Sequence, residues 1–433
     1  MAYQYIRAHP KSVASSLLIC VIIDLLFLSR TSVAHIAKKS NFSLHGKLDS
    51  PRNSLPVSRI NDRLRTLNKP GVKTIHSSDG DIIDCVPIDQ QLAFAHPKLK
   101  NHKLQKRPSS GTAESALNHF TKMGRSNKFG QLWHQNGRCP STTVPVRRVT
   151  AEDIRRAGSV ERHGRKFYQP PMPISVTQFQ TTGHEHALAY VNDNQYYGAH
   201  ASINVWRPNV ETSRDFSLSQ IWLLAGSFDG DDLNSIEAGW QVFPELYGDT
   251  NPRLFIYWTN DGYQTTGCYN LLCSGFVQVS SDIALGGSLF PDSVYDGTQY
   301  EIQLLIWKDP VTGNWWMKFG DNDLVGYWPA GIFKHLSVAA SLVQWGGEVY
   351  SKQLSGQHTT TQMGNGDFPQ EGISRASYFR DLFYVDATNH LVQPNYIQTI
   401  VDSPNCYSIQ LSNKNGLENS FYYGRPGLNP NCP

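Results

Sequence analysis

The sequence predicts an all-β protein: an antiparallel β-sandwich of the jelly-roll type, preceded by a small pro-segment. Two observations carry this expectation. After about residue 175, short runs rich in aromatic and β-branched residues follow one another, separated by Gly, Pro, Asn and Asp. Nine of the ten tryptophans fall between Trp206 and Trp345, which places the aromatic weight in that half of the chain. No internal repeat of propeller or solenoid period competes with this prediction.

The composition is typical of an extracellular protein with a large core. A chain of 433 residues has room for two or three domains. Hydrophobic residues make up 39% of it and charged residues only 17%. The formal net charge of +3 is too small to indicate a nucleic-acid partner.

The first 34 residues have the pattern of a secretory signal peptide. Arg7 and Lys11 form the basic region, residues 12–29 the apolar stretch, and Ser32-Val33-Ala34 a cleavage site. A signal anchor is the alternative, because the apolar stretch approaches a membrane span in length. Asp24 within the stretch favours cleavage. We therefore expect a secreted protein with no stable membrane association once the signal is removed.

Three further segments follow. Residues 35–74 are polar, basic and poor in aromatic side chains, which predicts a disordered linker, and they hold the candidate glycosylation site Asn41. Residues 75–165 are also polar and rich in proline, too poor in apolar residues to build much core alone. We expect this segment to be a pro-segment that rests on a larger domain, with a short helix at 151–157; a small independent module is the alternative. Residues 170–433 then form the β-sandwich.

About nine to twelve short strands are expected in this last segment. The clearest candidates are residues 201–206, 219–226, 236–243, 253–259, 275–279, 300–308, 315–319, 336–345 and 378–384. Turn sequences such as Asp229-Gly230, Asp261-Gly262 and Asp296-Gly297 separate them.

Two of the apolar runs each contain a glutamate with no basic residue close in sequence. Glu237 lies in the run 236–244, and Glu348 lies in the run 342–349 beside two glycines. Burying an isolated carboxylate costs several kcal/mol unless it is paired, hydrogen-bonded or neutral. Two such glutamates indicate an acid/base pair. The alternative is that each points to solvent from the polar face of its strand.

Residues of the same strand parity would share a face with these glutamates. Gln241 lies four residues after Glu237, and Gln344 four residues before Glu348, so either amide is a candidate oxyanion donor, although a structural role is the stronger expectation. Trp240 and Trp345 have the opposite parity and are expected in the core.

The motif His184-Glu185-His186 invites interpretation as a metal site, because His-x-His spacing puts both rings on one face of a strand. No further cluster of His, Asp or Glu completes such a site in the sequence. We expect two ordinary strand histidines, no metal and no cofactor.

The cysteine count predicts a disulfide framework. The sequence has seven cysteines, and signal cleavage would remove Cys20 and leave six. Six cysteines allow about 15 pairings. Their spacing favours the simplest one, which pairs Cys85 with Cys139, Cys268 with Cys273, and Cys406 with Cys432.

Several motifs together resemble one family. In the pro-segment they are Ile83-Asp84-Cys85-Val86-Pro87-Ile88, His96-Pro97-Lys98-Leu99-Lys100-Asn101-His102 and Gln131-Leu132-Trp133. Later they are Ser219-Gln220-Ile221-Trp222, Ile236-Glu237-Ala238-Gly239-Trp240-Gln241-Val242, Pro244-Glu245-Leu246-Tyr247-Gly248, Phe255-Ile256-Tyr257-Trp258-Thr259, Val325-Gly326-Tyr327-Trp328-Pro329 and Gln344-Trp345-Gly346-Gly347-Glu348-Val349. From about residue 75 to the C-terminus, the chain thus resembles the plant neprosin family of secreted glutamic peptidases.

The resemblance implies an N-terminal activation peptide that inhibits the enzyme, a β-sandwich catalytic domain and a catalytic pair at Glu237 and Glu348. It also implies the disulfides Cys268–Cys273 and Cys406–Cys432. Maturation could occur at Arg147-Arg148, at Arg155-Arg156 or within 162–166. Characterised relatives cut after proline, so a polypeptide substrate, with proline preference as a hypothesis, is expected. The compartment would be apoplast, cell wall or vacuole.

Two other functions fit the unaided pattern. A β-sandwich with two glutamates and many tryptophans also describes a jelly-roll glycoside hydrolase, since tryptophans stack on sugars. An inactive module that binds cell wall or peptide is the second alternative. The resemblance favours a secreted glutamic endopeptidase, made as a zymogen, that works at acidic pH with its two carboxyl groups sharing a proton.

Overall fold

The computed structural model describes residues 55–109, 130–166, 183–228, 231–321, 323–352, 357–412 and 419–433. The expected signal peptide, Cys20 and Asn41 lie outside these ranges. The chain divides into Met1–Asn53 and Ser54–Pro433, and everything described below belongs to the second unit. No helix among the described residues is both long enough and apolar enough to cross a membrane.

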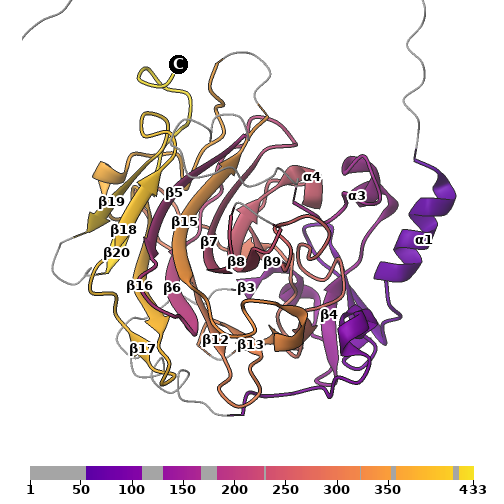
Figure 1. Cartoon of the computed structure of the whole chain (residues 1–433). Coiled ribbons are helices and arrows are strands. Elements are labelled where there is room, and N and C mark those ends of the chain that lie inside the picture. The colour runs from indigo at the N-terminus through magenta and orange to yellow at the C-terminus, as the bar shows by residue number, and fades with distance from the viewer. Residues whose placement is uncertain are drawn as a thin grey trace, which may run out of the picture. The chain divides into compact units, whose positions relative to one another are not determined.

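The larger part of the chain is an antiparallel β-sandwich, as expected (Figure 1). One sheet has the order β18-β5-β15-β7-β8-β9 in the described residues. Its strands are β5 His184–Val191, β7 Phe216–Ala225, β8 Asn234–Val242, β9 Arg253–Thr259, β15 Leu342–Tyr350 and β18 Gln398–Val401. We call it the six-stranded sheet.

The second sheet has the order β10-β14-β13-β12-β6-β16-β20-β19, with β17 paired to β16. Its strands are β6 Gly198–Asn204, β10 Val277–Gln278, β12 Glu301–Lys308, β13 Trp315–Phe319, β14 Asp323–Trp328, β16 Ser377–Val385, β17 Leu391–Val392, β19 Ser408–Ser412 and β20 Ser420–Gly424. Short elements between strands are the helix α4 Pro244–Tyr247 and the 3-10 helices η6 Ala330–Ile332 and η7 Pro369–Glu371.

Most of the expected strands are present, and two departures from the expectation have a clear physical reason. The run 336–345 becomes a strand only at Leu342 and then continues to Tyr350, so Glu348 lies well inside β15. Strand β14, like β18, β19 and β20, was not among the expected strands; its last four positions are all buried, so it shows no alternation. Its Gly326 meets the backbone oxygen of Val277 so closely that no side chain fits there, and this small residue hides the strand pattern.

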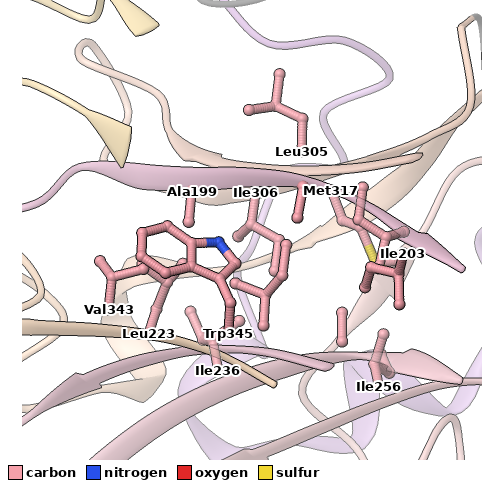
Figure 2. Packing of buried hydrophobic residues seen from close by; sticks show 14 of the residues in the cluster. Ala199, Ile203, Leu223, Ile236, Ile256, Leu305, Ile306, Met317, Val343 and Trp345 are labelled. Carbon is pink, nitrogen blue, oxygen red and sulfur yellow. The ribbon is translucent and has the colours of Figure 1, made fainter. Parts of the chain in front are cut away.

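The core lies between the two sheets. Apolar side chains from both inner faces interdigitate there, as Figure 2 shows for Ile236, Val343 and Trp345 of one sheet facing Ala199 and Ile306 of the other. Trp240 and Trp345 are fully buried in this core, as their parity predicted. Strand β8 is buried at all nine positions, because its outer face is covered too. That second burial explains why the strand lacks a polar–apolar alternation.

The pro-segment forms a small layer of its own. Its sheet has the order β1-β2-β4, with β1 Lys73–His76, β2 Ile82–Pro87 and β4 Thr143–Arg147. The short helix expected at 151–157 is α3, Ala151–Arg156, capped by Thr150. The 3-10 helices η1 Leu92–Ala95, η2 Pro97–Leu99 and η4 Leu132–Asn136 complete it. Strand β3 Gly130–Gln131 leaves this layer and pairs with β11 Leu289–Phe290 of the sandwich.

The expectation of a disordered linker over 35–74 is wrong for its C-terminal part. Residues Val57–Leu67 form helix α1, and Ile60 and Leu67 are buried against Val149 and Ile154 of the pro-segment. Ile60, Leu64 and Leu67 recur at helical spacing, which gives the helix an apolar stripe despite its polar composition. Docking onto the pro-segment supplies the burial that a helix of 11 residues needs in order to be stable.

The structure joins the six described cysteines as the three expected pairs, Cys85–Cys139, Cys268–Cys273 and Cys406–Cys432. The first disulfide lies in the pro-segment core, with Ile75, Ile83 and Trp133 around it. The second closes the loop that follows β9, and the third ties the C-terminus beside β19.

A buried ion pair joins the pro-segment to the sandwich. Arg253 of β9 is 1% exposed, and its Nη1 lies 2.6 Å from Asp81 Oδ2 in the turn before β2. Asp81 also pairs with Arg147 of β4 at 2.7 Å, while Asp249 remains on the other side of Arg253. Such a pair adds little over apolar contact, but losing one partner leaves an uncompensated charge.

We predict that Asp81→Asn lowers the free energy of unfolding of the full chain by about 3 kcal/mol. This is the lower end of the range for a broken buried ion pair, because Asp249 still faces Arg253 in the variant. Urea denaturation measures this quantity. Asp62→Asn is the matched control, since its partner Arg65 and Asp62 itself are both exposed on α1, and its loss should stay below about 1 kcal/mol. Equal losses for the two variants would contradict the prediction.

Candidate active site

Strand parity brings the two glutamates to one face of the six-stranded sheet. Glu237 of β8 is opposite Trp222 of β7, and Glu348 of β15 is opposite Leu218 of the same strand. The face carrying them points away from the sandwich core. Glu237 is 0% exposed and Glu348 is 3% exposed, so the alternative that they point to solvent is wrong.

Glu237 lies in a group of hydrogen-bond donors. Its Oε1 accepts from Ser235 Oγ and from Tyr263 OH, both at 2.8 Å. Its Oε2 accepts from Gln220 Nε2 at 3.1 Å. Burial and the neighbouring Glu237 charge raise the pKa of Tyr263 well above its usual value, so this phenol stays protonated and donates.

Glu348 has imidazole neighbours instead. His184 Nδ1 donates to Glu348 Oε1 at 2.6 Å, and His186 Nε2 lies 3.8 Å from the same oxygen. His186 is the residue directly opposite Glu348 in the antiparallel pair β5–β15. The expectation that these are ordinary strand histidines is therefore wrong: both lie at the glutamate pair. The sequence showed their shared face, but not that β5 pairs with the strand of Glu348.

A lysine from the end of the pro-segment lies between the glutamates. Lys166 Nζ is 2.5 Å from Glu237 Oε2 and 3.8 Å from Glu348 Oε2. The sum of the two contacts sets an upper limit of 6.3 Å on the separation of these carboxylate oxygens. The ammonium group also lies over the rings of Tyr257 and Tyr263, at 5.2 and 5.5 Å from their centroids.

The charges in this cluster stabilise one another. Burial opposes the charged form of Lys166, but Glu237 and Glu348 outweigh it and raise the Lys166 pKa. Burial alone would raise the pKa of Glu348. The Lys166 ammonium, the hydrogen bond from His184 and the charge of His186 together hold that pKa well below its usual range.

The polypeptide around Lys166 is fixed in this position. Gly164 accepts a hydrogen bond from the Tyr269 amide at 2.8 Å, and the Lys166 amide donates to Tyr257 OH at 3.3 Å. Gly164 has φ +80°, and a Cβ there would lie 2.7 Å from Leu272. Only glycine allows the chain to approach the sandwich so closely. The chain is thus held against the sandwich as far as Lys166, the residue after the expected end of the pro-segment.

The two amides singled out by parity do not contact the glutamates. Gln241 is buried and donates through Nε2 to Tyr247 OH at 2.8 Å, a structural role. Gln344 lies half-buried on β15, opposite Trp222 and Tyr190. Gln220 of β7 is the amide hydrogen-bonded to Glu237, and its Oε1 has no partner among the described residues. Gln220 was missed because its strand, β7, carries no charged residue that would have marked it as part of a site.

No metal-binding group is found at the histidines in the described part of the chain. There, the one set of potential ligand atoms within 4.8 Å of one another is His358, Cys406 and Cys432. Both cysteines of that set belong to a disulfide, so their sulfur atoms are not thiolates.

Comparison with known proteins agrees with the fold and the two-part organisation. The family description "Neprosin" matches residues 213–426, and "Neprosin activation peptide" matches residues 74–190. The activation-peptide match includes β5, which in the structure is a strand of the six-stranded sheet.

Solved structures give distant likenesses. Scytalido-glutamic peptidase with a peptide-based transition state analog is 11% identical, with a TM-score of 0.31, over 56% of this chain and 97% of that one. SCP-B, a member of the eqolisin family in complex with the tripeptide Ala-Ile-His, is 11% identical, with a TM-score of 0.26 and coverages of 56% and 97%. The β-porphyranase BpGH16B from Bacteroides plebeius is 9% identical, with a TM-score of 0.21, over 38% and 55%.

TM-scores of this size are too low to transfer a function, so the assignment rests on the two sequence matches, which together span most of the described residues. The chain belongs to the neprosin family, as a glutamic peptidase zymogen in which an activation peptide precedes the catalytic β-sandwich.

Proposed function

We propose that Glu237 and Glu348 are the catalytic dyad of a secreted endopeptidase that works at acidic pH. The observation that carries the proposal is the contact of one ammonium group with both carboxylates, which limits their Oε2 atoms to a separation of 6.3 Å at most. A water molecule and a peptide carbonyl fit between groups at this spacing. Both glutamates are buried, so their charges act on bound substrate with little screening by solvent.

The proposed acid/base chemistry begins once Lys166 no longer lies between the two glutamates. Two buried carboxylates at this distance cannot both remain ionised at low cost, so the pair takes up one proton and titrates as a unit. The ionised member takes a proton from water, whose oxygen attacks the peptide carbonyl. The protonated member donates to the carbonyl oxygen or the leaving nitrogen. Because the shared proton is required, the rate should be highest at acidic pH.

The glycoside hydrolase alternative loses its main support. It rested on tryptophans that might stack on sugars, but eight of the nine tryptophans between Trp206 and Trp345 lie in the sandwich core. The ninth, Trp222, is 5% exposed and lies opposite Glu237. A sugar-binding platform needs exposed ring faces, which the eight core tryptophans do not offer.

Proline preference and secretion are further parts of the proposal. The rings of Tyr257 and Tyr263 lie beside the Lys166 ammonium, where a substrate residue would lie in the processed enzyme, and aromatic rings offer apolar faces to a pyrrolidine ring. Three disulfides favour an oxidising compartment, in agreement with the signal peptide read from residues 1–34. Apoplast, cell wall or vacuole all satisfy this requirement.

The test is cleavage of a peptide library, with and without proline, by the processed protein between pH 3 and pH 8. We expect cleavage after proline with an acidic optimum, and a loss of about 10²–10⁴-fold in kcat for Glu237→Gln and for Glu348→Gln, the usual contribution of an acid or base. Glu371→Gln, an exposed glutamate bonded to Tyr295, is the control. Wild-type activity in either dyad variant would exclude that residue, and proline-independent cleavage would reject the specificity.

Lys166 accounts for the inactivity of the zymogen. Its ammonium group contacts both carboxylates and compensates their charges, so neither a water molecule nor a shared proton has a place between them. The inhibition is electrostatic as well as steric. Removing one partner of such a buried cluster costs several kcal/mol, which would favour release of the segment.

We predict that Lys166→Met, which keeps the length of the side chain and removes its charge, shortens the half-time of conversion of the zymogen to mature enzyme at a fixed acidic pH by about tenfold or more. Gel electrophoresis of timed samples measures the half-time. Lys100→Met is the control, because Lys100 is an exposed lysine of the pro-segment that lies outside the candidate maturation sites. Indistinguishable half-times for all three proteins would reject Lys166 as the inhibitory group.

His163 connects pro-segment docking to pH. It is 2% exposed, and burial, followed by the charges of Arg63, Arg147 and Arg156, lowers its pKa to about 4, with Asp153 acting in the opposite direction. An undocked histidine has a pKa of about 6.5. The undocked form therefore binds more protons than the docked form. The free energy of docking weakens as pH falls from about 6.5 to about 4, and below about 4 the whole contribution of His163 is lost.

We predict that His163→Leu removes up to about 3 kcal/mol of the pH dependence of the free energy of unfolding between pH 7 and pH 4. Urea denaturation at the two pH values measures it, in a Glu237→Gln background that prevents self-cleavage. His76→Leu, at an exposed position of β1, is the control. The prediction fails if both variants lose stability on acidification as the parent does.

A further inference from the structure

The glutamates of the proposed dyad have different surroundings once Lys166 is set aside. In the described part of the chain, the remaining donors to Glu237 are neutral: Ser235, Tyr263 and Gln220. Glu348 instead faces His184 and His186 of β5. The proposal requires a cut between Lys166 and His184, which removes Lys166 and leaves the β5 histidines in the six-stranded sheet. The asymmetry is therefore built into the catalytic domain.

His186 is supported by a second carboxylate. Its Nδ1 donates to Asp402 Oδ2 at 2.7 Å, and its backbone amide donates to the same oxygen at 2.9 Å. Asp402 follows β18, the strand beside β5, and its amide donates to the backbone oxygen of His186. This three-point link fixes the imidazole plane, so that Nε2 is the nitrogen directed to Glu348 at 3.8 Å. The ring also packs edge-on against Trp222.

The charge state of His186 follows from these neighbours. Burial opposes the imidazolium form, but the charge of Asp402, the hydrogen bond to it and the charge of Glu348 outweigh burial and raise the pKa of His186; Lys166 acts against them. After Lys166 leaves, that opposing charge is gone. The titratable groups facing this point are Glu348 of β15, Glu237 of β8, His184 of β5, Asp402 after β18, and Tyr263 and Tyr269 of the loop after β9.

We propose that His186, held by Asp402, is a positioning residue that keeps Glu348 ionised in the processed enzyme, so that Glu348 is the general base and Glu237 the general acid. The assignment rests on the proposed dyad and adds the division of labour within it. His184 donates to the same oxygen of Glu348 and lies between Phe216 and Tyr350, which orients the carboxylate. Neither histidine touches substrate in this scheme.

The proton balance of the reaction closes with these roles. Glu348 takes a proton from water while the water oxygen bonds to the carbonyl carbon, and Glu237 gives its proton to the carbonyl oxygen. The tetrahedral intermediate then collapses: Glu348 passes its proton to the leaving nitrogen, and a hydroxyl proton of the intermediate returns to Glu237. The peptide bond is broken, one water is consumed, and both glutamates regain their starting states.

The test is the pH profile of kcat/KM for the processed enzyme carrying His186→Gln or Asp402→Asn. Loss of the cation beside Glu348 raises the pKa of this base, so the acidic limb of the profile should move to higher pH by about one unit. The rate on that limb then falls about tenfold, while the rate at the optimum changes less. Asp402→Asn should move the limb in the same direction, because His186 loses the carboxylate that keeps it charged. His335→Gln, at the exposed pair with Asp232, is the control.

Each outcome decides the proposal. An unmoved acidic limb, with the rate reduced equally at every pH, would show that His186 and Asp402 are only structural and would overturn it. Movement of the basic limb alone would make Glu348 the acid and overturn the assignment. Failure of the dyad itself is recognised separately, by activity that survives in Glu348→Gln. If His186→Gln does not fold, Asp402→Asn still gives the profile, since the substituted side-chain amide keeps an oxygen able to accept from the His186 backbone amide.

Discussion

The structure depends on the burial of two carboxylates on the outer face of one sheet. A buried charge must be compensated by opposite charge and hydrogen bonds, or it destabilises the fold by several kcal/mol. The chain meets this demand differently at each glutamate. Glu237 receives hydroxyl and amide donors, whereas Glu348 receives imidazoles from the neighbouring strand. The Cys268–Cys273 disulfide closes the loop that carries Tyr269, whose amide holds Gly164.

The need to compensate these two buried charges also connects the proposed inhibition by Lys166 with the proposed catalytic mechanism. In the zymogen, the Lys166 ammonium compensates both carboxylates. In the proposed mechanism this cation is absent from the processed enzyme, and a proton shared by the pair takes over its electrostatic role. The inhibitor and the catalytic proton thus occupy equivalent places in the charge balance. An apolar side chain in the place of Lys166 would block the site equally well, but it would leave two buried charges uncompensated.

Sequence reasoning located the glutamate pair because strand parity is a local property. Glu237 and Trp240 alternate along one buried strand, so one side chain faces the core and the other the site, and Glu348 and Trp345 repeat the pattern. Parity did not predict the role of Gln241 correctly. Gln241 shares the face of Glu237, but it lies four residues further along the strand and donates to Tyr247 OH instead. Helix α1 was missed because its apolar stripe is short and the surrounding composition is that of a linker.

The remaining groups of the site come from contacts that no local pattern reveals. Lys166 meets Glu237 across 71 residues of sequence, and Asp402 meets His186 across 216. The motif His184-Glu185-His186 was visible, but its meaning depends on the sheet order that places β5 beside β15. Once that order is known, the register fixes His186 opposite Glu348.

The charges of the site give a reason for the proposed acidic optimum that does not depend on the peptide being cut. Among the described residues, Glu237, Glu348 and Asp402 contribute three carboxylates, and in the proposed processed enzyme His186 is the cation that faces them, with His184 as a donor. Three anions facing one cation in a buried site are unfavourable, and protonation of one carboxylate is the least costly remedy. Asp402 is committed to His186, and Glu348 lies beside two imidazoles. Glu237 lies among neutral donors, and the proposed mechanism therefore gives it the role of the acid.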